Sequence, residues 1–200
     1  MSFRIENKYA LSAAKLSEFY TFLKDCSAKE IYPTRLIKSI YFDNQNFSSY
    51  RESMDSVLPR KKIRIRSYPK TSANYNFEIK ISSIEGKFKT QKKNINYINI
   101  LSKGYHDCDY GLCYPVVEVS YYRKYFSIFN LRVTLDTSIS YNQFRKKKIL
   151  PYQDTCIMEV KNNNLDNLNF INKKIPFRTT RFSKYCNAID ELYTIGQIYK

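Results

Sequence analysis

Basic residues alternate with apolar ones in the segment Arg60–Tyr68. A β-strand sends successive side chains to opposite faces, so Lys62, Arg64 and Arg66 would share one face and the isoleucines between them the other. An ordinary half-exposed strand with its charges in water would show the same pattern. However, three cations on one face repel one another, and a bound polyanion would offset that repulsion. The segment is therefore a candidate for binding a chain of negative charges.

The same alternation recurs elsewhere in the chain. Glu78 and Lys80 are separated by a single apolar residue, and so are Glu159 and Lys161. An ordinary small barrel fills its interior with apolar side chains. If the apolar faces of these strands instead pack against helices, the charged faces are left to line a polar, water-filled lumen. Such a lumen would hold the cations Lys8, Lys62, Arg64, Arg66, Lys80, Lys89, Arg123, Arg132 and Lys161, with the carboxylates Glu6, Glu78 and Glu159 among them.

These residue types suit phosphate chemistry. Arginine engages phosphate oxygens bidentately, and carboxylates are the hard oxygen ligands that Mg²⁺ and Mn²⁺ prefer. Phosphoryl transfer needs mainly positioning and charge neutralisation, so the lack of a Ser-His or Cys-His pairing is no objection. The pattern predicts a tunnel for a nucleoside triphosphate and a divalent cation. The alternative for Glu78 and Lys80 is a cross-strand ion pair with no further role.

Apolar periodicity predicts the elements that position these residues. A helix is expected over 12–24 and another from about Ser183, with Tyr185, Ala188, Ile189, Leu192 and Ile195 inward. Strands are expected over 3–9, 36–43, 86–89, 115–126, 131–136 and 157–161, with a central hairpin over 60–82. Short helices are expected near 47–54, 95–101 and 165–171, and a loop or strand end over 145–148. Pro33 is expected to interrupt the chain, and Gly104 to end a helix.

Some side chains are expected to support the tunnel rather than bind its ligand. Tyr9, Tyr41 and Tyr68 would pack against the wall, and Asp43 and Asp136 are as suited to capping turns as to binding metal.

Composition sets the broad class of protein. The chain has 200 residues and a formal net charge of +16, which indicates an anionic partner; one domain over 1–200 is the simplest organisation. The five cysteines form no Cys-x-x-Cys pair and no apolar run could span a bilayer, so a soluble, cytoplasmic protein without disulfides is expected. His106, Cys108 and Cys113 lack the fourth ligand and the spacing of a zinc site.

Eight short motifs occur in an order typical of one family. They are Arg4-x-Glu6-x-Lys8-Tyr9, Ser39-Ile40-Tyr41-Phe42-Asp43 with Tyr50, Lys62-x-Arg64-x-Arg66-x-Tyr68, Glu78-x-Lys80, Tyr121-x-Arg123, Arg132-x-Thr134-x-Asp136, Glu159-x-Lys161 and Arg181-x-Ser183-Lys184-Tyr185. Together they resemble the VTC domain, the polyphosphate polymerase domain of the vacuolar transporter chaperone complex and its bacterial relatives. That domain belongs to the triphosphate tunnel metalloenzymes, which are related to the CYTH group. The resemblance runs from Arg4 to about Ile189.

The resemblance implies an α+β fold, an antiparallel β-barrel tunnel with flanking helices, that binds ATP with Mn²⁺ or Mg²⁺. The polymerases pass the terminal phosphate of ATP to a growing polyphosphate chain, so ATP and polyphosphate or pyrophosphate are the implied partners. Carried over residue by residue, Arg64, Arg66, Lys8 and Lys80 would act at the reacting phosphates, and Glu159, with Glu6 and Glu78, would bind the metal. The phosphate-binding set would be Lys62, Lys89, Arg123, Arg132, Lys161, Arg181 and Lys184, where Lys87 or Lys92 could replace Lys89.

Two departures from the family pattern bear on function. Arg4 stands where CYTH relatives have the first glutamate of a Glu-x-Glu-x-Lys motif, which removes one possible metal ligand. Arg181 stands where the fungal enzymes tend to have lysine, which keeps the charge. The chain also shows neither an SPX domain nor membrane helices, so export of the polymer does not follow.

Two alternative functions use the same residues. The tunnel could hydrolyse triphosphate, with water as the acceptor, or it could bind polyphosphate or nucleic acid without catalysis. Nucleic acid is the less favoured ligand, because most of the 19 tyrosines sit beside apolar residues, whereas a nucleic-acid groove exposes its aromatics.

Overall fold

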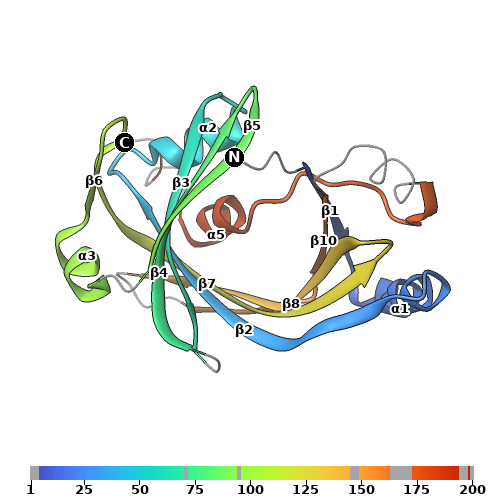
Figure 1. Cartoon of the computed structure of the whole chain (residues 1–200). Helices are drawn as coiled ribbons and strands as arrows, with labels where there is room; N and C mark the ends of the chain where they lie inside the picture. Colours follow the sequence, from blue (N-terminus) through green and yellow to red (C-terminus); the bar gives the residue numbers. More distant parts are fainter. Residues whose placement is uncertain are drawn as a thin grey trace. The chain divides into compact units, whose positions relative to one another are not determined.

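A computed structural model describes residues 5–69, 72–93, 96–144, 149–162, 173–193 and 198. Its strands are β1 (Ile5–Leu11), β2 (Lys29–Asp43), β3 (Arg60–Tyr68), β4 (Ser72–Ser83), β5 (Gly86–Lys93), β6 (Tyr105–Asp107), β7 (Gly111–Ile128), β8 (Leu131–Gln143), β9 (Ile149–Gln153) and β10 (Cys156–Asn162). Its helices are the 3-10 turn η1 (Ala13–Lys15), α1 (Leu16–Asp25), α2 (Ser48–Met54), α3 (Tyr97–Lys103) and α5 (Lys184–Leu192) (Figure 1).

The strands form one sheet in the order β1-β10-β8-β7-β2-β3-β4-β5, with β6 beside β7 and β9 beside β8. The pairs β1–β10, β10–β8, β2–β3, β3–β4 and β4–β5 are antiparallel. In the described part of the chain this order is open, with β1 and β5 at its ends. The predicted antiparallel sheet with helices is thus present.

The chain forms two compact units. Unit 1 comprises residues 1–36, 121–139 and 152–182, and unit 2 comprises 37–120, 140–151 and 183–200. Strands β2, β7 and β8 each supply residues to both units.

Unit 1 has its core on one face of β1, β10 and β8. Tyr9, Val133 and Val160 point into this core and are at most 1% exposed. Helix α1 covers the same face through Phe19, Phe22 and Leu23, which recur at helical spacing. Because the apolar residues of each strand alternate with charged ones, the opposite face of these strands carries the charged side chains.

Unit 2 repeats this division with β3 and β4. Ile63, Ile65 and Phe77 form an apolar cluster, and α3 packs against it through Ile100 and Leu101. Asn96 caps the N-terminus of helix α3, because its side chain accepts the Asn99 N–H. The helix ends at Gly104, where φ is +82° and an added Cβ would lie 2.8 Å from the Cys113 carbonyl oxygen. Gly104 therefore ends the helix as predicted, since both the backbone angle and the close approach require glycine.

Several predictions about elements are corrected or extended. Pro33 does not interrupt the chain but lies inside β2, in a stretch whose first six residues are exposed. Proline is tolerated where a strand needs no ladder hydrogen bond at that position. The short strands β6 and β9 were not expected, and β7 and β8 extend further than predicted. Arg4, the 145–148 run, the 165–171 helix and Ile195 lie outside the described residues.

None of the helices in the described residues is long and apolar enough to cross a membrane.

Candidate functional site

The polar face of unit 2 carries basic side chains in rows that cross β3, β4 and β5. Lys62 pairs in register with Lys80, and Lys80 with Lys89. The row therefore holds three lysines side by side. Like charges directly opposite each other destabilise a sheet. A nearby carboxylate or a bound anion would offset the repulsion between these lysines.

One carboxylate in the next row supplies part of that compensation. Arg64 lies opposite Glu78 and donates to Glu78 Oε2 from Nε at 2.8 Å and from Nη2 at 2.6 Å. Lys89 Nζ donates to Glu78 Oε1 at 2.6 Å. Burial raises the pKa of Glu78, but the charges of Arg64, Arg66 and Lys89 outweigh it and lower the pKa to about 2. Glu78 is thus a carboxylate, and it holds the Arg64 guanidinium in a fixed orientation.

A third row places a buried arginine on the same face. Arg66 is 9% exposed, lies opposite Ser39 of β2 and donates from Nε to Ser39 Oγ at 3.1 Å. Tyr41 lies two residues further along β2 opposite Arg64, and its hydroxyl accepts from Arg64 Nη1 at 3.2 Å. Strand β2 therefore lines one side of the two arginines with hydroxyl groups.

Helix α5 adds its N-terminus to this face. Ser183 caps the helix by accepting the Cys186 N–H, and Lys62 Nζ donates to the same Ser183 Oγ at 2.8 Å. Lys184, the first residue of α5, is 7% exposed. A helix N-terminus carries partial positive charge, so α5 increases the positive potential where Lys62 and Lys184 already lie.

The carboxylate of Asp43 anchors α5 and α2 to the end of β2. It accepts the N–H groups of Ser49 and Tyr50 in the first turn of α2, at 3.1 and 3.0 Å, and it accepts the hydroxyl of Tyr185 from α5. Burial raises the pKa of Asp43. Asp43 therefore caps a helix, one of the two roles that the sequence left open.

The polar face of unit 1 has a different charge pattern, with opposite charges as neighbours. Glu6 lies opposite Lys161, and Lys8 opposite Glu159. Lys161 Nζ is 3.0 Å from Glu6 Oε1 and 3.5 Å from Glu159 Oε2, and Lys8 Nζ is 4.0 Å from Glu159 Oε1. Burial lowers the pKa of Lys161 and the charge of Arg123 adds to this effect, while Glu159 and Glu6 oppose it.

A buried arginine joins this unit 1 cluster from β7. Arg123 donates to Asp136 from Nε at 2.5 Å and from Nη2 at 2.6 Å, and its Nη2 also lies 3.3 Å from Glu159 Oε2. Asp136 is fully buried. It thus orients Arg123, in the way that Glu78 orients Arg64.

The remaining predicted residues of unit 1 lie near β1 and at the surface. Thr180 N–H donates to the Lys8 carbonyl at 2.7 Å, and Lys8 Nζ donates to the Phe182 carbonyl at 2.7 Å. This places the coil with exposed Arg181 beside β1. Arg132 lies opposite Lys161 and is exposed.

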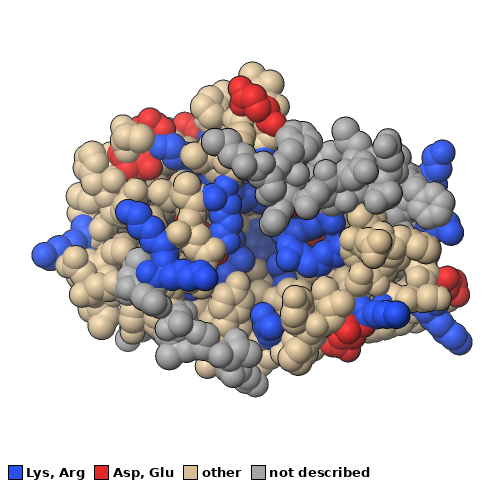
Figure 2. Space-filling view, viewed as in Figure 1, with Lys and Arg blue, Asp and Glu red and all other residues tan. Residues whose placement is uncertain are grey.

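The structure thus divides the predicted site residues between two clusters. We call the first the clamp face: Lys62, Arg64, Arg66, Glu78, Lys80, Lys89 and Lys184, all in unit 2. We call the second the mixed-charge face: Glu6, Lys8, Arg123, Arg132, Glu159, Lys161 and Arg181, all in unit 1. Figure 2 shows that Lys and Arg side chains predominate over Asp and Glu on the side viewed; the whole chain has 34 basic against 18 acidic residues.

The two faces differ in how well their carboxylates fit a divalent cation. Both oxygens of Glu78 are held at 2.6–2.8 Å by Arg64 and Lys89, whereas the cations around Glu159 lie at 3.3–4.0 Å. Mg²⁺ is commonly bound by one or two carboxylates together with substrate phosphates. Glu159 and Glu6 fit that requirement, and Glu78 fits it less well.

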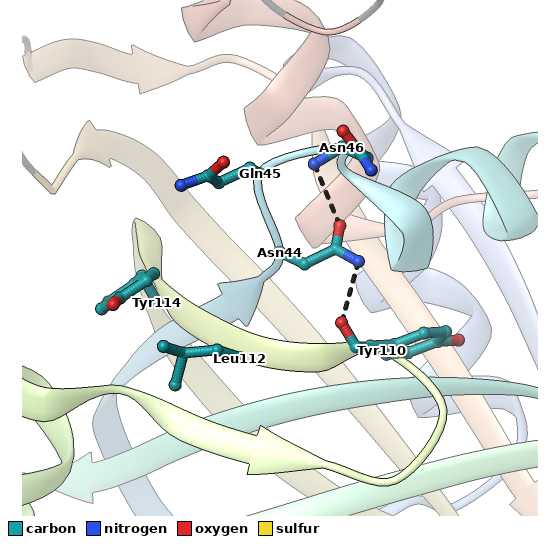
Figure 3. Close-up of a pocket in the computed structure, with 6 residues that line it drawn as sticks. All are labelled: Asn44, Gln45, Asn46, Tyr110, Leu112 and Tyr114. Carbon is teal, nitrogen blue, oxygen red and sulfur yellow. Dashed lines mark hydrogen bonds between the residues drawn. The ribbon is translucent and has the colours of Figure 1, made fainter.

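Two other features of unit 2 lack the chemistry of a phosphate site. A cavity of about 290 Å³ is lined by Asn44, Gln45, Asn46, Tyr110, Leu112 and Tyr114, none of them charged (Figure 3). Asp107, Cys108 and Asp109 are the one group of three possible metal ligands found in the described residues. Lys61 Nζ lies 3.0 Å from Asp107 Oδ1 and 2.5 Å from Asp109 Oδ2, so both carboxylates of this group are already paired with a lysine. His106 and Cys113 are not part of it.

Sequence reasoning missed the groups that position the cations. Ser39 and Tyr41 lie on the clamp face, and Asp136 holds Arg123. Tyr41 was expected to support the wall by packing, and its ring does stack on Tyr185, but its hydroxyl also accepts from Arg64. A sequence signal for this role of Tyr41 exists: Tyr41 and Ser39 are two residues apart on one strand and therefore share a face. In the structure they lie opposite Arg64 and Arg66.

The fold is shared with solved structures of low sequence identity. A putative adenylyl cyclase from Hippeastrum, described as having a dominant triphosphatase activity, matches with a TM-score of 0.58 and 14% identity over 98% of both chains. A putative adenylate cyclase from Vibrio parahaemolyticus matches with a TM-score of 0.60 and 10% identity over 94% of this chain and 98% of that one. A chain of the Schizosaccharomyces pombe Mediator head module matches with a TM-score of 0.53 and 9% identity over 85% and 92%. The predicted α+β tunnel fold is thereby confirmed.

The sequence also defines a family. The model of the VTC domain matches residues 3–109 and 105–193, so the chain belongs to the VTC domain family. A comparison with curated protein sequences finds no match.

Proposed function

We propose that this protein is a metal-dependent polyphosphate polymerase that transfers the terminal phosphate of ATP to a growing polyphosphate chain. The observation that carries the proposal is the clamp face. There, three lysines in register lie beside Arg64 and Arg66, with Glu78 as the carboxylate that two of these cations share. Membership of the VTC domain family supports the same activity.

The clamp face suits a phosphate chain better than a single phosphate. The row of Lys62, Lys80 and Lys89 crosses three strands, and neighbouring strands lie about 4.8 Å apart. Successive phosphates along a chain would therefore each meet a cation. Arg64 and Arg66, two residues apart on β3, would bind oxygens bidentately.

In the transfer step, an oxygen of the acceptor phosphate forms a bond to the terminal phosphorus of ATP, and the bond from that phosphorus to the bridging oxygen breaks to release ADP. Arg64, Arg66 and Lys80 of the clamp face would stabilise the charge on the oxygens of the transferred group. Glu78 keeps the Arg64 guanidinium oriented at no cost at the moment of reaction. Asp136 does the same for Arg123.

Glu159, with Glu6, would hold Mn²⁺ or Mg²⁺, which supplies further neutralisation of phosphate charge. Lys161 and Lys8, which face Glu159, would then turn toward phosphate oxygens.

A second candidate function is hydrolysis of triphosphate, with water as the acceptor. It is favoured by the likeness to the Hippeastrum protein described as a triphosphatase. The same cations serve both reactions, so the products distinguish them.

The test is incubation of the purified protein with ATP and Mn²⁺, following free phosphate and polyphosphate in parallel. Polymer that forms with wild type and is lost in Arg66→Ala supports the polymerase. Free phosphate without polymer supports the hydrolase and overturns the polymerase. Neither product, together with tight binding of polyphosphate, would indicate a protein that binds the polymer without catalysis.

A further inference from the structure

Tyr41 occupies a position on the clamp face that its surroundings make unusual. Its side chain is 6% exposed, and its ring stacks on Tyr185 with centroids 5.2 Å apart and planes 26° apart. The Arg64 guanidinium lies 5.8 Å from the ring centroid and donates to the hydroxyl at 3.2 Å. Within the described residues, the Tyr41 hydroxyl makes no other hydrogen bond, so its own proton is available to an acceptor.

Positive charges reach Tyr41 from two neighbouring elements. Arg64 and Arg66 approach from β3 and Lys184 from α5. Burial raises the pKa of Tyr41, but these three charges and the hydrogen bond from Arg64 outweigh it and lower the pKa to about 8. Four other titratable groups lie near Tyr41: Asp43 on the same strand, Tyr185 on α5, Tyr141 on β8, and Glu78, which is held by Arg64.

We propose that Tyr41 is a further phosphate-binding residue whose ionisation switches the clamp face off. As a neutral phenol, it donates its hydrogen bond to an oxygen of the phosphate held by Arg64. As a phenolate, it has no proton to donate, it pairs with Arg64 itself, and it repels the phosphate. This inference rests on the proposed function only in taking a phosphate chain as the ligand.

Linkage fixes the direction of the pH dependence. A phosphate chain beside Tyr41 disfavours the phenolate, so binding raises the pKa of Tyr41 above its value in the free protein, and the proton is retained. Below about pH 8 the free and bound proteins are both protonated and affinity is unaffected. Above about pH 8 the free protein must take up a proton to bind, so affinity falls by up to about tenfold per pH unit until the pKa of the bound form is reached.

The experiment is isothermal titration of the full chain with inorganic tripolyphosphate, without metal, from about pH 6.5 to about pH 9.5, a range that brackets the expected titration. Wild type is compared with Tyr41→Phe, which keeps the ring stacked on Tyr185, and with Tyr105→Phe as a control. Tyr105 packs on the opposite, apolar side of β4 against Phe77. For Tyr41→Phe we expect affinity at about pH 7 to fall by roughly 10- to 150-fold, the loss of one hydrogen bond to a charged group, and the decline above pH 8 to disappear.

A second readout observes the phenol directly. The ultraviolet difference between wild type and Tyr41→Phe should show one tyrosine ionising near pH 8 in the free protein, and saturating tripolyphosphate should move that titration to higher pH. A tyrosine that served only to support Arg64 would weaken binding equally at every pH. The proposal is overturned if the Tyr41→Phe and wild-type pH profiles are parallel, or if the ligand leaves the titration unmoved.

The two proposals fail separately. A pH profile that depends on Tyr41 in a protein that makes no polymer leaves this inference standing and overturns the polymerase. If polymer forms and the pH profile of binding is the same in wild type and Tyr41→Phe, the polymerase stands and this inference is overturned.

Discussion

The two polar faces use the same residue types in opposite arrangements. On the mixed-charge face of unit 1, Glu6 and Lys161 are opposite each other, as are Lys8 and Glu159, so each of these four charges has an oppositely charged neighbour. On the clamp face of unit 2, the row of Lys62, Lys80 and Lys89 holds three like charges. The first pattern places acids directly opposite bases, whereas the second places like charges directly opposite one another, which a bound anion would stabilise.

This difference teaches how one alternating strand pattern can serve two purposes. A carboxylate that faces cations at 3.3–4.0 Å, such as Glu159, can exchange them for a metal ion. A carboxylate held on both oxygens, such as Glu78, instead fixes the cations around it. The following variants test whether the faces differ in this way.

The largest effect is expected for Arg64→Ala on the clamp face. Losing a preorganised guanidinium typically costs about 100- to 1,000-fold in rate, and here it also leaves Glu78 with one cation fewer. Polymer synthesis from ATP is the measurement. Lys38→Ala is the control. Lys38 is next to Ser39 on β2, so its side chain lies on the other face of the strand, and its Nζ is 3.7 Å from Glu118. Equal losses in both variants would contradict a specific clamp.

Glu159→Gln should weaken the response to metal by at least about tenfold, because the amide loses the charge that a divalent cation requires. Raising the Mn²⁺ concentration should restore part of the activity in Glu159→Gln but none in Glu78→Gln, where the orientation of Arg64 is lost. Activity measured against Mn²⁺ concentration separates the two. The comparison between faces breaks down if both variants respond alike.

The stability of unit 2 should depend on pH through Glu78. Its pKa is lowered from 4.5 to about 2 in the folded protein, so its stabilising effect is complete above the unfolded pKa and is lost as pH falls from about 5 toward 2. The loss corresponds to about 3 kcal/mol of unfolding free energy. Urea unfolding at several pH values checks this, with Glu78→Gln expected to flatten the dependence and the exposed Glu30→Gln expected to retain it.

The smallest effect, and the most diagnostic, is expected for Lys80→Gln. Removing the middle charge of the lysine row should raise the stability of the free protein by up to about 1 kcal/mol, while tripolyphosphate binds more weakly. Melting temperatures with and without tripolyphosphate measure both. Lys38→Gln should change neither the stability nor the binding of tripolyphosphate. If Lys80→Gln lowers the stability of the free protein, repulsion within the lysine row does not destabilise it and this interpretation is wrong.

The alternation of residue types along the sequence predicted much of the fold. Period-two patterns in β3, β4 and β10 decide which side chains share a face, and the spacing of Phe19, Phe22 and Leu23 decides the buried side of α1. The eight ordered motifs were sufficient to indicate the VTC domain, which the family match confirms. The roles of individual site residues remain predictions that the variants above address.

Only the tertiary structure decided which of these side chains meet. Local sequence sets the face of a side chain, but the register between strands sets its neighbours, and register depends on turns and on pairing between distant segments. Thus the pairing of Arg64 with Glu78 and of Arg123 with Asp136, the cap that Asp43 provides, and the place of Tyr41 beside Arg64 could not be inferred from spacing. The sequence by itself determined that cations would line one face of the strands. The register determined that in unit 2 three lysines stand in one row, and that in unit 1 Lys8 and Lys161 stand opposite glutamates.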